Sequence, residues 1–436
     1  MDAVKVGLLG LGTVGGGTAT VLIRNAKEIQ SRLGREIQIS HVAGLDIASQ
    51  TIVNPETTKL TEDAFEVVND PEVEIVVELI GGYTLAKDLV MKAIENGKHI
   101  VTANKALIAT HGSEIMKAAA EQGVSVSYEA AVAGGIPIIK AMREGLAGNQ
   151  IQWVAGIING TGNFILTEMR DKSRDFSDVL KEAQELGYAE ADPTFDVEGI
   201  DAAHKLTILA SLAFGVELQF EKAYTEGIRK ITTEDMVYAE ELGYRIKHLG
   251  LTRKTEKGIE LRVHPTLIPE KRLIANVDGV MNAVLVYGDA VGPTLYYGAG
   301  AGAEPTASAV VADIIDTVRT IDAPLHHKVP LLGFQNDAMR ETPILPIEDV
   351  ETAYYLRMQA EDKPGVLAEV SDTFAKNSIS IEAVLQKEAV SGENSVHLIM
   401  LTQKCIEANV NQAITAVESL TSVQGDVVRI RMEHLD

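Results

Sequence analysis

The sequence has few of the features that mark secreted or membrane proteins. Cys405 is the single cysteine among 436 residues, so neither an intrachain disulfide nor a cysteine metal cluster can form. The N-terminus lacks the basic start and the unbroken apolar run of a signal peptide. No apolar run is long enough to cross a bilayer. These absences predict a soluble protein that stays in the cytoplasm.

The sequence also lacks a basic block. It carries 39 lysines and arginines against 62 aspartates and glutamates, for a net charge of −23. Because such a chain offers no match for a phosphate backbone or an anionic bilayer, we expect neither nucleic acid nor membrane as a partner. Hydrophobic residues make up 46% of the chain, enough for sizeable cores, and the length predicts about three domains.

A glycine loop stands near the N-terminus between a strand-like run at 4–9 and a helical pattern at 18–33. This GxGxxG loop, in that context, is typical of dinucleotide-binding domains. Its first two glycines would permit a tight turn and the close approach of a pyrophosphate, and the third would let the helix pack closely. The helix N-terminus would supply amide donors. The predicted cofactor contacts of this loop are Gly10, Gly12, Thr13, Val14 and Gly15.

Strand and helix patterns continue to alternate up to residue 128. This alternation predicts a parallel, doubly wound sheet that binds its ligand at the carboxyl edge of the strands. Lys105 follows a strand end at that edge, so it is a candidate contact for cofactor or substrate, and a surface lysine in a turn is the alternative. Further strands are expected at 37–43, 74–80, 98–102 and 124–128, and helices at 84–96 and 113–122.

The choice between NAD and NADP stays open. Asp46 follows the second strand and is placed to meet a ribose hydroxyl, which weakly favours NAD. Arg35 and Lys59 could still bind the extra phosphate of NADP.

Residues 129–137, EAAVAGGIP, form another loop at the same edge. Small residues and two glycines would let backbone carbonyls turn inward beside the Glu129 carboxylate. Such a set of oxygens suits a hard cation. A loop of small residues that simply packs tightly is the alternative.

The segment 183–205, AQELGYAEADPTFDVEGIDAAHK, combines four acids with a terminal lysine. Its pattern becomes helical after Gly199, so Asp201 and Lys205 lie on one helix face. This pair, beside further acids, could hold an ammonium group and move a proton. A solvated ion pair next to a loop is the alternative.

The rest of the middle region mixes strand and helix patterns. Thr161 or Asn163 is expected to cap the helix that runs toward residue 169, and Ser177 the next one. The glycine-rich run 298–302 would permit a close backbone approach to a ligand. Strands are expected at 151–158, 258–263, 275–278 and 281–287, and helices at 177–186, 199–213 and 304–320.

The last 85 or so residues follow a proline-containing linker at 343–349 and predict a βαββαβ, ferredoxin-like unit. The expected strands and helices, in order, are 353–360, 366–376, 379–387, 395–402, 407–420 and 426–432.

Several motifs, in the same order along the chain, resemble those of homoserine dehydrogenases. The segment 183–205 matches that family's signature throughout, and the glycine loop and residues 103–106, 129–137 and 159–161 are also similar. The resemblance covers essentially the whole chain. It implies NAD(P)-dependent interconversion of homoserine and aspartate 4-semialdehyde in threonine, methionine and isoleucine biosynthesis.

The resemblance also implies residue roles. Lys205 would be the acid/base residue, Glu190 and Asp201 would contact homoserine, and Lys105 would lie beside both substrate and cofactor. Asp192 and Asp196 would shape the loop. Gly187 and Gly302 resemble cofactor-contacting positions. The similar sodium site consists of Glu129, Val132, Gly134 and Ile136, the last three through their carbonyls.

Residues 362–367, DKPGVL, resemble the loop of an ACT domain, a small-molecule regulatory module. In this family such a domain implies feedback by threonine, and an oligomerisation appendage without ligand is the alternative. The predicted effector contacts are Pro364, Gly365, Val366, Leu367 and Asn377.

The resulting prediction is an α/β protein with three units and a homodimeric or homotetrameric assembly. A Rossmann-type domain at 1–135 is completed by the helix at 304–320. An α+β catalytic and dimerisation domain spans 136–303, a return segment and linker 321–350, and the ACT domain 351–436. An amino-acid sensor with an inactive cofactor fold, or a dehydrogenase of another semialdehyde, would be the alternatives.

Overall fold

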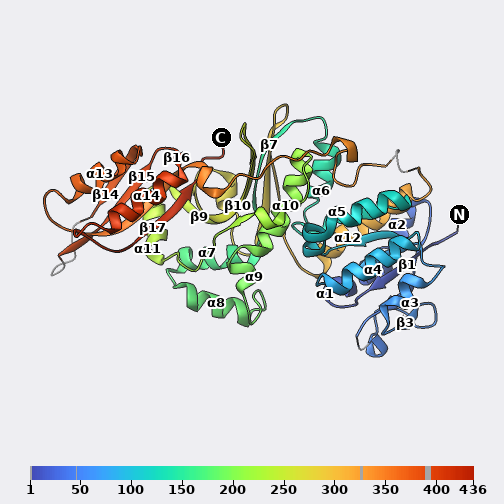
Figure 1. Ribbon diagram of the computed structural model, residues 1–436. Coiled ribbons are helices and arrows are strands. Elements are labelled where there is room, and N and C mark those ends of the chain that lie inside the picture. The colour runs from blue at the N-terminus through green and yellow to red at the C-terminus, as the bar shows by residue number, and fades with distance from the viewer. Residues whose placement is uncertain (1, 46, 325–327, 388–393) are drawn as a thin grey trace.

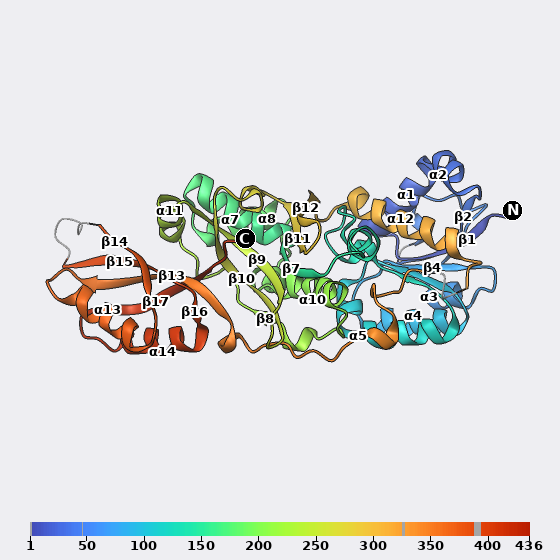
Figure 2. The same cartoon turned by 90° about the horizontal axis from the view of Figure 1, so that it is seen from above.

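The structure is a computed structural model that describes residues 2–45, 47–324, 328–387 and 394–436. The molecule is elongated, with the amino-terminal unit at one end and the carboxyl-terminal unit at the other (Figures 1 and 2). Among the described residues, no helix combines the length and apolar character needed to span a bilayer.

The amino-terminal unit is built on a 6-stranded parallel sheet in the order β3-β2-β1-β4-β5-β6. This is the doubly wound Rossmann order, so the predicted fold of this region is confirmed. The strands are β1 (Val4–Leu9), β2 (Ile37–Ala43), β3 (Lys59–Thr61), β4 (Ile75–Glu78), β5 (His99–Thr102) and β6 (Val126–Ser127).

The helices of this unit differ from the prediction in their bounds. The expected helix at 18–33 is two helices that meet at Asn25, and the last helix begins at Lys105 rather than at residue 113. Position 112, inside that helix, has room only for glycine, because a Cβ there would lie 2.5 Å from the Leu218 side chain. The helices are α1 (Thr13–Arg24), α2 (Ala26–Leu33), α3 (Ala64–Asn69), α4 (Thr84–Glu95) and α5 (Lys105–Gln122).

The middle and carboxyl-terminal units share one 11-stranded sheet. Most of its strands follow the order β12-β11-β7-β9-β10-β17-β13-β15-β14, and β8 and β16 lie off this path, paired with β10 and β13. The strand β9 had no counterpart in the prediction, and residues 273–276 form a 3₁₀ helix where a strand was expected. The middle strands are β7 (Ile151–Ile157), β8 (Tyr224–Thr225), β9 (Tyr244–Lys254), β10 (Ile259–Pro269), β11 (Met281–Gly288) and β12 (Gly292–Ala299).

Helices of the middle region cover this sheet, and the last helix of that region, α12, packs against the amino-terminal unit. The helix α10 is buried along nearly its whole length. The helix α12 packs against α1, where a Cβ on Gly17 would lie 2.5 Å from the Ala303 carbonyl oxygen. The helices are α6 (Ile138–Lys140), α7 (Gly160–Lys172), α8 (Phe176–Glu185), α9 (Thr194–Val197), α10 (Ile200–Phe214), α11 (Thr233–Glu241) and α12 (Ala303–Thr320).

The carboxyl-terminal unit has the predicted ferredoxin-like order, with one additional short strand. Its last strand, β17, pairs in parallel with β10 through Thr266 to Arg431 and Leu267 to Met432. The elements are β13 (Glu351–Glu361), α13 (Val366–Lys376), β14 (Ile381–Gln386), β15 (Ser395–Thr402), β16 (Cys405–Ile406), α14 (Glu407–Glu418) and β17 (Val423–Met432).

A shared apolar core also joins the carboxyl-terminal unit to the middle unit. One face of its sheet, including Tyr355 and Ile430, packs in a single buried cluster with Met169, Val179 and Val197 from α7, α8 and α9. The other face is covered by its own α13 and α14. The carboxyl-terminal unit therefore shares both a sheet and an apolar core with the middle unit, although a linker precedes it in sequence.

Candidate active site

The glycine loop after β1 has the geometry of a dinucleotide-binding turn. Gly10 has a φ of +97°, and a Cβ on Gly15 would collide with the Gly10 carbonyl oxygen, so both glycines are required by the protein's own packing. A Cβ on Gly12 would meet nothing within 4 Å. The space above Gly12 is therefore open, at the N-terminus of α1 where Thr13 and Val14 begin the helix.

A cavity of about 780 Å³ adjoins this loop. It lies between the carboxyl ends of β1 and β2 and is bounded by Gly10, Gly12, Gly44, Glu62 and other residues. Among the described residues that line it there is no lysine or arginine.

Neither basic residue that was considered for NADP lies at this edge. Arg35 precedes β2, where it donates to the Asp2 carbonyl, and Lys59 begins β3 and pairs with Asp70 at 2.8 Å. Both stand at the amino end of their strands, opposite the ligand edge. Asp46 lies outside the described residues.

Two polar residues that the sequence did not single out order the edge between β4 and α5. The buried Glu78 carboxylate accepts hydrogen bonds from the Ile80 and Gly81 amides and from the Thr102 hydroxyl. Asn104 caps α5 by accepting from the Leu107 amide. The cap sets the start of α5 and hence the position of Lys105, so the alternative of a turn lysine is wrong.

Lys105, Asp201 and Lys205 form the centre of the site, where the first unit meets α10. The Asp201 carboxylate lies between the two ammonium groups, with Lys105 Nζ 2.5 Å from one oxygen and Lys205 Nζ 2.7 Å from the other. Lys205 also donates to the Ile158 carbonyl at 2.6 Å. The Asp201 side chain is 3% exposed and that of Lys205 11%, whereas Lys105 is 35% exposed. Solvent or a ligand therefore reaches the cluster from the Lys105 side.

Asn159 ties this cluster to the acidic loop. Its amide nitrogen donates to Asp196 and to Asp201, both at 2.8 Å, and its oxygen accepts from the Gly162 amide at 2.7 Å. Asn159 is therefore the cap of α7, which corrects the expectation of Thr161 or Asn163. At the start of this helix the sequence offers several residues that can serve as cap, so it predicted a cap but not which residue forms it.

The helix α8 likewise lacks its predicted cap. Its cap position is Asp175, without a side-chain hydrogen bond, rather than Ser177.

The electrostatics of the cluster separate the two lysines. Burial alone would raise the pKa of Asp201, but the two neighbouring ammonium groups outweigh it and hold the pKa well below its usual range. Burial, assisted by the Lys105 charge, lowers the pKa of Lys205 despite Asp201. For Lys105, burial acts downward, but attraction by Asp201 prevails and raises the pKa. The neutral amine is therefore more accessible to Lys205 than to Lys105.

Glu190, another predicted contact, is exposed on the loop after α8, and its charge adds to that of Asp201 in raising the pKa of Lys105. Gly187 ends α8 with a φ of +75°, and a Cβ there would meet nothing within 4 Å. Gly302 starts α12 with a φ of +126°. Both glycines leave backbone accessible.

The Glu129 loop partly fits the expected cation site. The Glu129 carboxylate accepts from the Ile139 and Lys140 amides, so it already has partners. Ala133 and Gly134 adopt consecutive left-handed conformations. Within the described residues the Val132 and Gly134 carbonyls accept no hydrogen bond, whereas that of Ile136 accepts from Ile138. Carboxylate and carbonyl oxygens keep further lone pairs after these bonds, so Glu129 and the carbonyls of Val132, Gly134 and Ile136 together fit a hard cation.

A cavity of about 350 Å³ lies at the loop before α13 and is bounded by Pro364, Gly365, Val366 and Leu367, among others. Gly365, at a φ of +99°, precedes the helix and supplies no side-chain cap, while the Val366 amide donates to the Lys363 carbonyl at 3.5 Å. Asn377 does not line this cavity. It stands at the far end of α13, about 16 Å away at 1.5 Å per residue, and donates to the Thr373 carbonyl.

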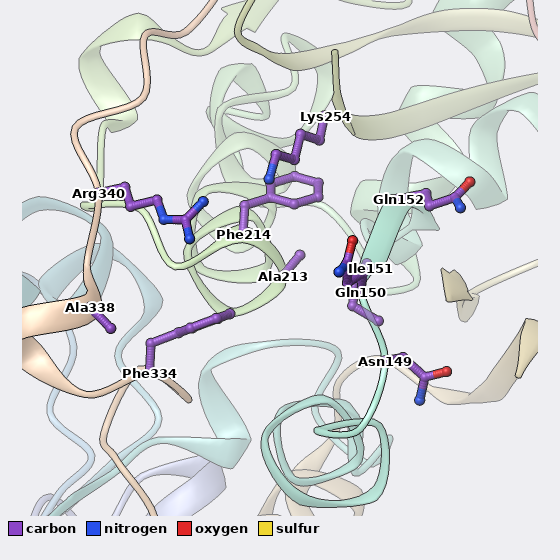
Figure 3. A pocket seen from close by; sticks show the side chains of 10 residues that line it. All are labelled: Asn149, Gln150, Ile151, Gln152, Ala213, Phe214, Lys254, Phe334, Ala338 and Arg340. Carbon is purple, nitrogen blue, oxygen red and sulfur yellow. The ribbon is translucent and has the colours of Figure 1, made fainter. Parts of the chain in front are cut away.

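Another cavity, of about 490 Å³, lies at the opposite end of α10 (Figure 3). Lys254 and Arg340 stand beside the rings of Phe214 and Phe334 there. None of the predicted site residues lines this cavity.

The fold and the site together define an NAD(P)-dependent oxidoreductase: a dinucleotide loop at one side and a buried lysine able to exchange a proton at the other. Comparison with known proteins identifies the family. Residues 10–129 match the profile "Homoserine dehydrogenase, NAD binding domain", 137–315 match "Homoserine dehydrogenase" and 354–421 match "ACT domain".

Relatives cover the whole chain. The sequence is 63% identical over 440 residues to a homoserine dehydrogenase of Pseudomonas aeruginosa, covering 100% of both. The crystal structure of a homoserine dehydrogenase from Thiobacillus denitrificans superposes with a TM-score of 0.95 at 63% identity, over 100% of this chain and 99% of that one. A hyperthermophilic archaeal homoserine dehydrogenase in complex with NADPH gives a TM-score of 0.62 at 26% identity, over 74% and 99%. The chain belongs to the homoserine dehydrogenase family and carries an ACT domain.

Proposed function

We propose that the chain interconverts L-homoserine and L-aspartate 4-semialdehyde with Lys205 as acid and base. The observation that carries this proposal is the Lys105–Asp201–Lys205 cluster at the junction of the cofactor unit and α10. The nicotinamide, when bound, accepts or supplies the hydride. Every other requirement falls on the protein, which must hold the substrate and manage one proton at its oxygen.

Lys205 is suited to both directions of the reaction. Oxidation of an alcohol requires a base, and the lowered pKa of Lys205 increases the fraction of neutral amine at a given pH. Reduction requires an acid, which the ammonium form supplies. Asp201 and the Ile158 carbonyl accept hydrogen bonds from Nζ and hold it in one orientation.

Glu190 is the acid that is best placed for the substrate's ammonium group. Both oxygens of Asp201 already accept hydrogen bonds from lysines, whereas Glu190 is exposed on the acidic loop and its charge acts on Lys105. We therefore assign the ammonium chiefly to Glu190. The predicted contact of Asp201 would form when substrate displaces one lysine, and Asp201 otherwise orients Lys105 and Lys205. Lys105, as the more exposed cation, can meet the substrate carboxylate.

For the cofactor we propose a preference for NAD over NADP. The cavity beside the glycine loop has no lysine or arginine among its described residues, and Glu62 adds a negative charge that a 2′-phosphate would meet. An archaeal homoserine dehydrogenase has been solved in complex with NADPH, so the proposed preference for NAD rests on the residues that line the cavity of this chain.

Initial rates measured at the nicotinamide absorbance band with homoserine test both proposals. We expect turnover with either cofactor and a higher kcat/KM with NAD, by roughly tenfold for one repelled phosphate. Absence of turnover with homoserine would contradict the reaction, and a higher kcat/KM with NADP would contradict the cofactor assignment alone.

We further propose that threonine binds the ACT domain and inhibits the enzyme, in keeping with a place in threonine, methionine and isoleucine biosynthesis. The Leu367 amide, at the start of α13, would donate a hydrogen bond to its carboxylate. Gly365→Ala is the test, since an alanine there is strained at a φ of +99°. We expect the concentration of threonine that halves activity to rise at least about tenfold, with basal activity retained. Unchanged inhibition would place threonine elsewhere.

We also propose a sodium ion at the Glu129 carboxylate and the carbonyls of Val132, Gly134 and Ile136, and a dimer formed through the middle unit. The edge strand β12 and its hairpin leave Tyr297 59% and Val291 49% exposed, which supports an interface there. Light scattering of the purified protein tests the dimer, and activity in sodium against tetramethylammonium chloride tests the ion. The domain limits at residues 135, 303 and 350 and the cytoplasmic location stay predictions from the sequence.

A further inference from the structure

Arg431, in the last strand of the ACT domain, is a fully buried charge with an unusual set of partners. Its side chain is 0% exposed. It donates two hydrogen bonds to Glu407, at the start of α14, which belongs to the same domain. It also donates to Glu226 at 2.7 Å and to the Tyr224 hydroxyl at 3.1 Å, both of which belong to the middle unit. One arginine therefore spans the boundary between the regulatory and catalytic parts of the chain.

Glu226 lies in a short segment, 224–228, that is held from several sides. Its amide donates to the Val263 carbonyl on β10 at 2.8 Å, and its carbonyl accepts from His248 Nε2 at 2.9 Å. Its carboxylate accepts from Arg431 and from the Tyr224 hydroxyl. Through its ion pair with Glu226, Arg431 therefore helps to fix the position of this segment.

The next two residues of that segment touch the turn that leads into α10. The Ile228 amide donates to the Val197 carbonyl at 3.0 Å, and a Cβ on Gly227 would lie 2.8 Å from the same oxygen. The ring of His248 fills the space beside Gly199, where a Cβ would lie 3.1 Å from Cε1. Gly199, at a φ of +83°, is the residue from which α10 starts.

This turn carries acids of the active site. Asp196 precedes Val197 on α9, and Asp201 is in the first turn of α10. Asn159 bridges the two carboxylates. A shift of Val197 or Gly199 would therefore change the position of Asp201 relative to Lys105 and Lys205.

We propose that Arg431, acting through Glu226, is a positioning residue for the homoserine site, so that the last strand of the ACT domain forms part of the support of the active site. The inference rests on the proposed binding of homoserine beside Asp201. It assigns the ACT domain a second role, in basal catalysis, that does not require an effector.

A purely structural ion pair at a domain boundary is the competing explanation, and the chain offers a matched control. Arg357, also in the ACT domain, donates to Asp235 at 2.6 Å across the same boundary, and the Asp235 side chain is 0% exposed. Its partners on α11, Glu234 and Asp235, have no hydrogen bond to residues 194–201 among those described. Arg431→Lys and Arg357→Lys therefore make the same chemical change in comparable surroundings.

The experiment compares Arg431→Lys, Glu226→Gln and Arg357→Lys in the full-length enzyme. We expect the first two to raise the KM for homoserine roughly tenfold, because a displacement near 1 Å is enough for such effects, and to leave the KM for the cofactor unchanged. Arg357→Lys should lower the melting temperature without moving either KM. Glu226→Gln is close to isosteric and keeps an acceptor for Arg431, so it carries the test if Arg431→Lys fails to fold.

Hydrogen exchange over residues 194–203 provides a readout that is independent of activity. Faster exchange there in Arg431→Lys, but not in Arg357→Lys, supports the link. Faster exchange with an unchanged homoserine KM would leave the link standing and overturn the proposed substrate site. Unchanged exchange in Arg431→Lys and Glu226→Gln, or an equal rise in homoserine KM with Arg357→Lys, would overturn the inference.

Discussion

Two clusters of buried charges join the middle unit to its neighbours, and they differ in what their residues can do. At the amino-terminal junction, Lys105 of the cofactor unit meets Asp201 and Lys205 of α10. At the carboxyl-terminal junction, Arg262 and Glu433 pair within the shared sheet, and both are 5% exposed or less. Both clusters cross a domain boundary, but only the first is open to a ligand.

The choice of cation accounts for the difference. A lysine that is buried can lose its proton, and the pKa of Lys205 is lowered, whereas an arginine stays charged in any protein environment. The pKa of Arg262 is raised in spite of its burial, because Glu433 and Glu260 face it. The comparison supports the proposed proton chemistry at the amino-terminal cluster and a structural role for the Arg262–Glu433 pair.

The largest expected effect comes from removing the carboxyl-terminal unit. Deletion of residues 351–436 would expose the face of α7, α8 and α9 that packs on Tyr355 and Ile430 and would leave β10 as a sheet edge. We expect insoluble protein, measured as the soluble fraction after expression. A soluble, active fragment ending at residue 350 would show that the two units fold separately. The threonine site is for this reason better tested by Gly365→Ala than by truncation.

Lys205→Ala should abolish most turnover and leave the fold intact. General acid–base catalysis contributes about 10²–10⁴-fold, so we expect kcat to fall by that range while the Kd for NAD stays the same. Titration of cofactor fluorescence provides the control for binding. Turnover close to that of the wild type would refute the assignment of Lys205.

Glu433→Gln should have the opposite profile. Removing one of the two buried carboxylate charges that face Arg262, with Glu260 still in place, should cost about 1–3 kcal/mol of unfolding free energy, with kcat and KM unchanged in the folded enzyme. Urea unfolding measures the loss. A change in KM without a change in stability would erase the contrast between the clusters.

The same residue predicts an acid dependence. Burial would raise the pKa of Glu433, but Arg262 and Arg253 outweigh it and lower the pKa to about 2. Because the folded-state pKa is depressed, this stabilisation is present above the ordinary value near ~4.5 and is lost as pH falls toward the folded value. Wild-type stability should therefore drop more steeply between these limits than that of Glu433→Gln.

Lys105→Met and Asp201→Asn should move the pH profile of homoserine oxidation in opposite directions. The Lys105 charge lowers the pKa of Lys205, so its removal should shift the rising limb of kcat/KM to higher pH. The Asp201 charge raises that pKa, so its neutralisation should shift the limb to lower pH. Shifts of about one unit are expected for one charge at this range. Parallel shifts would indicate another titrating group.

Glu190→Gln is expected to have the smallest effect, since the residue is exposed and its contact with the ammonium is screened. The KM for homoserine should rise several-fold, roughly by the 1 kcal/mol of an exposed pair, and kcat should change little. An unaltered homoserine KM would indicate that Asp201, rather than Glu190, binds the substrate's ammonium group.

Much of the fold followed from local patterns. The alternation up to residue 128 and the βαββαβ order after 350 appeared in the structure because each element is amphipathic or apolar at its own period. The strand β9 was missed because its sequence, YRIKHLGLTRK, places polar residues where apolar ones are expected. Lys247 and His248 are buried there with partners of their own, Asp278 and the Glu226 carbonyl.

Prediction of the candidate site was more uneven. The Asp201–Lys205 pair is visible from a spacing of four residues on one helix, because the contact is local. The contact of Asp201 with Lys105 joins residues that are far apart in sequence, and the roles of Asn159 and Glu78 depend on which strand ends lie side by side. Resemblance to a family indicated Lys105 but offered no signal for Glu78.

The sequence by itself determined the class of each unit, the cofactor loop and the acid–lysine segment, because these depend on short-range periodicity and on a long signature. Only the tertiary structure decided that β17 continues the sheet of β10, and that Arg431 reaches Glu226. It also decided which of the two lysines is buried deeply enough to have its pKa lowered. These features depend on sheet pairing and burial between distant segments, which no local pattern encodes.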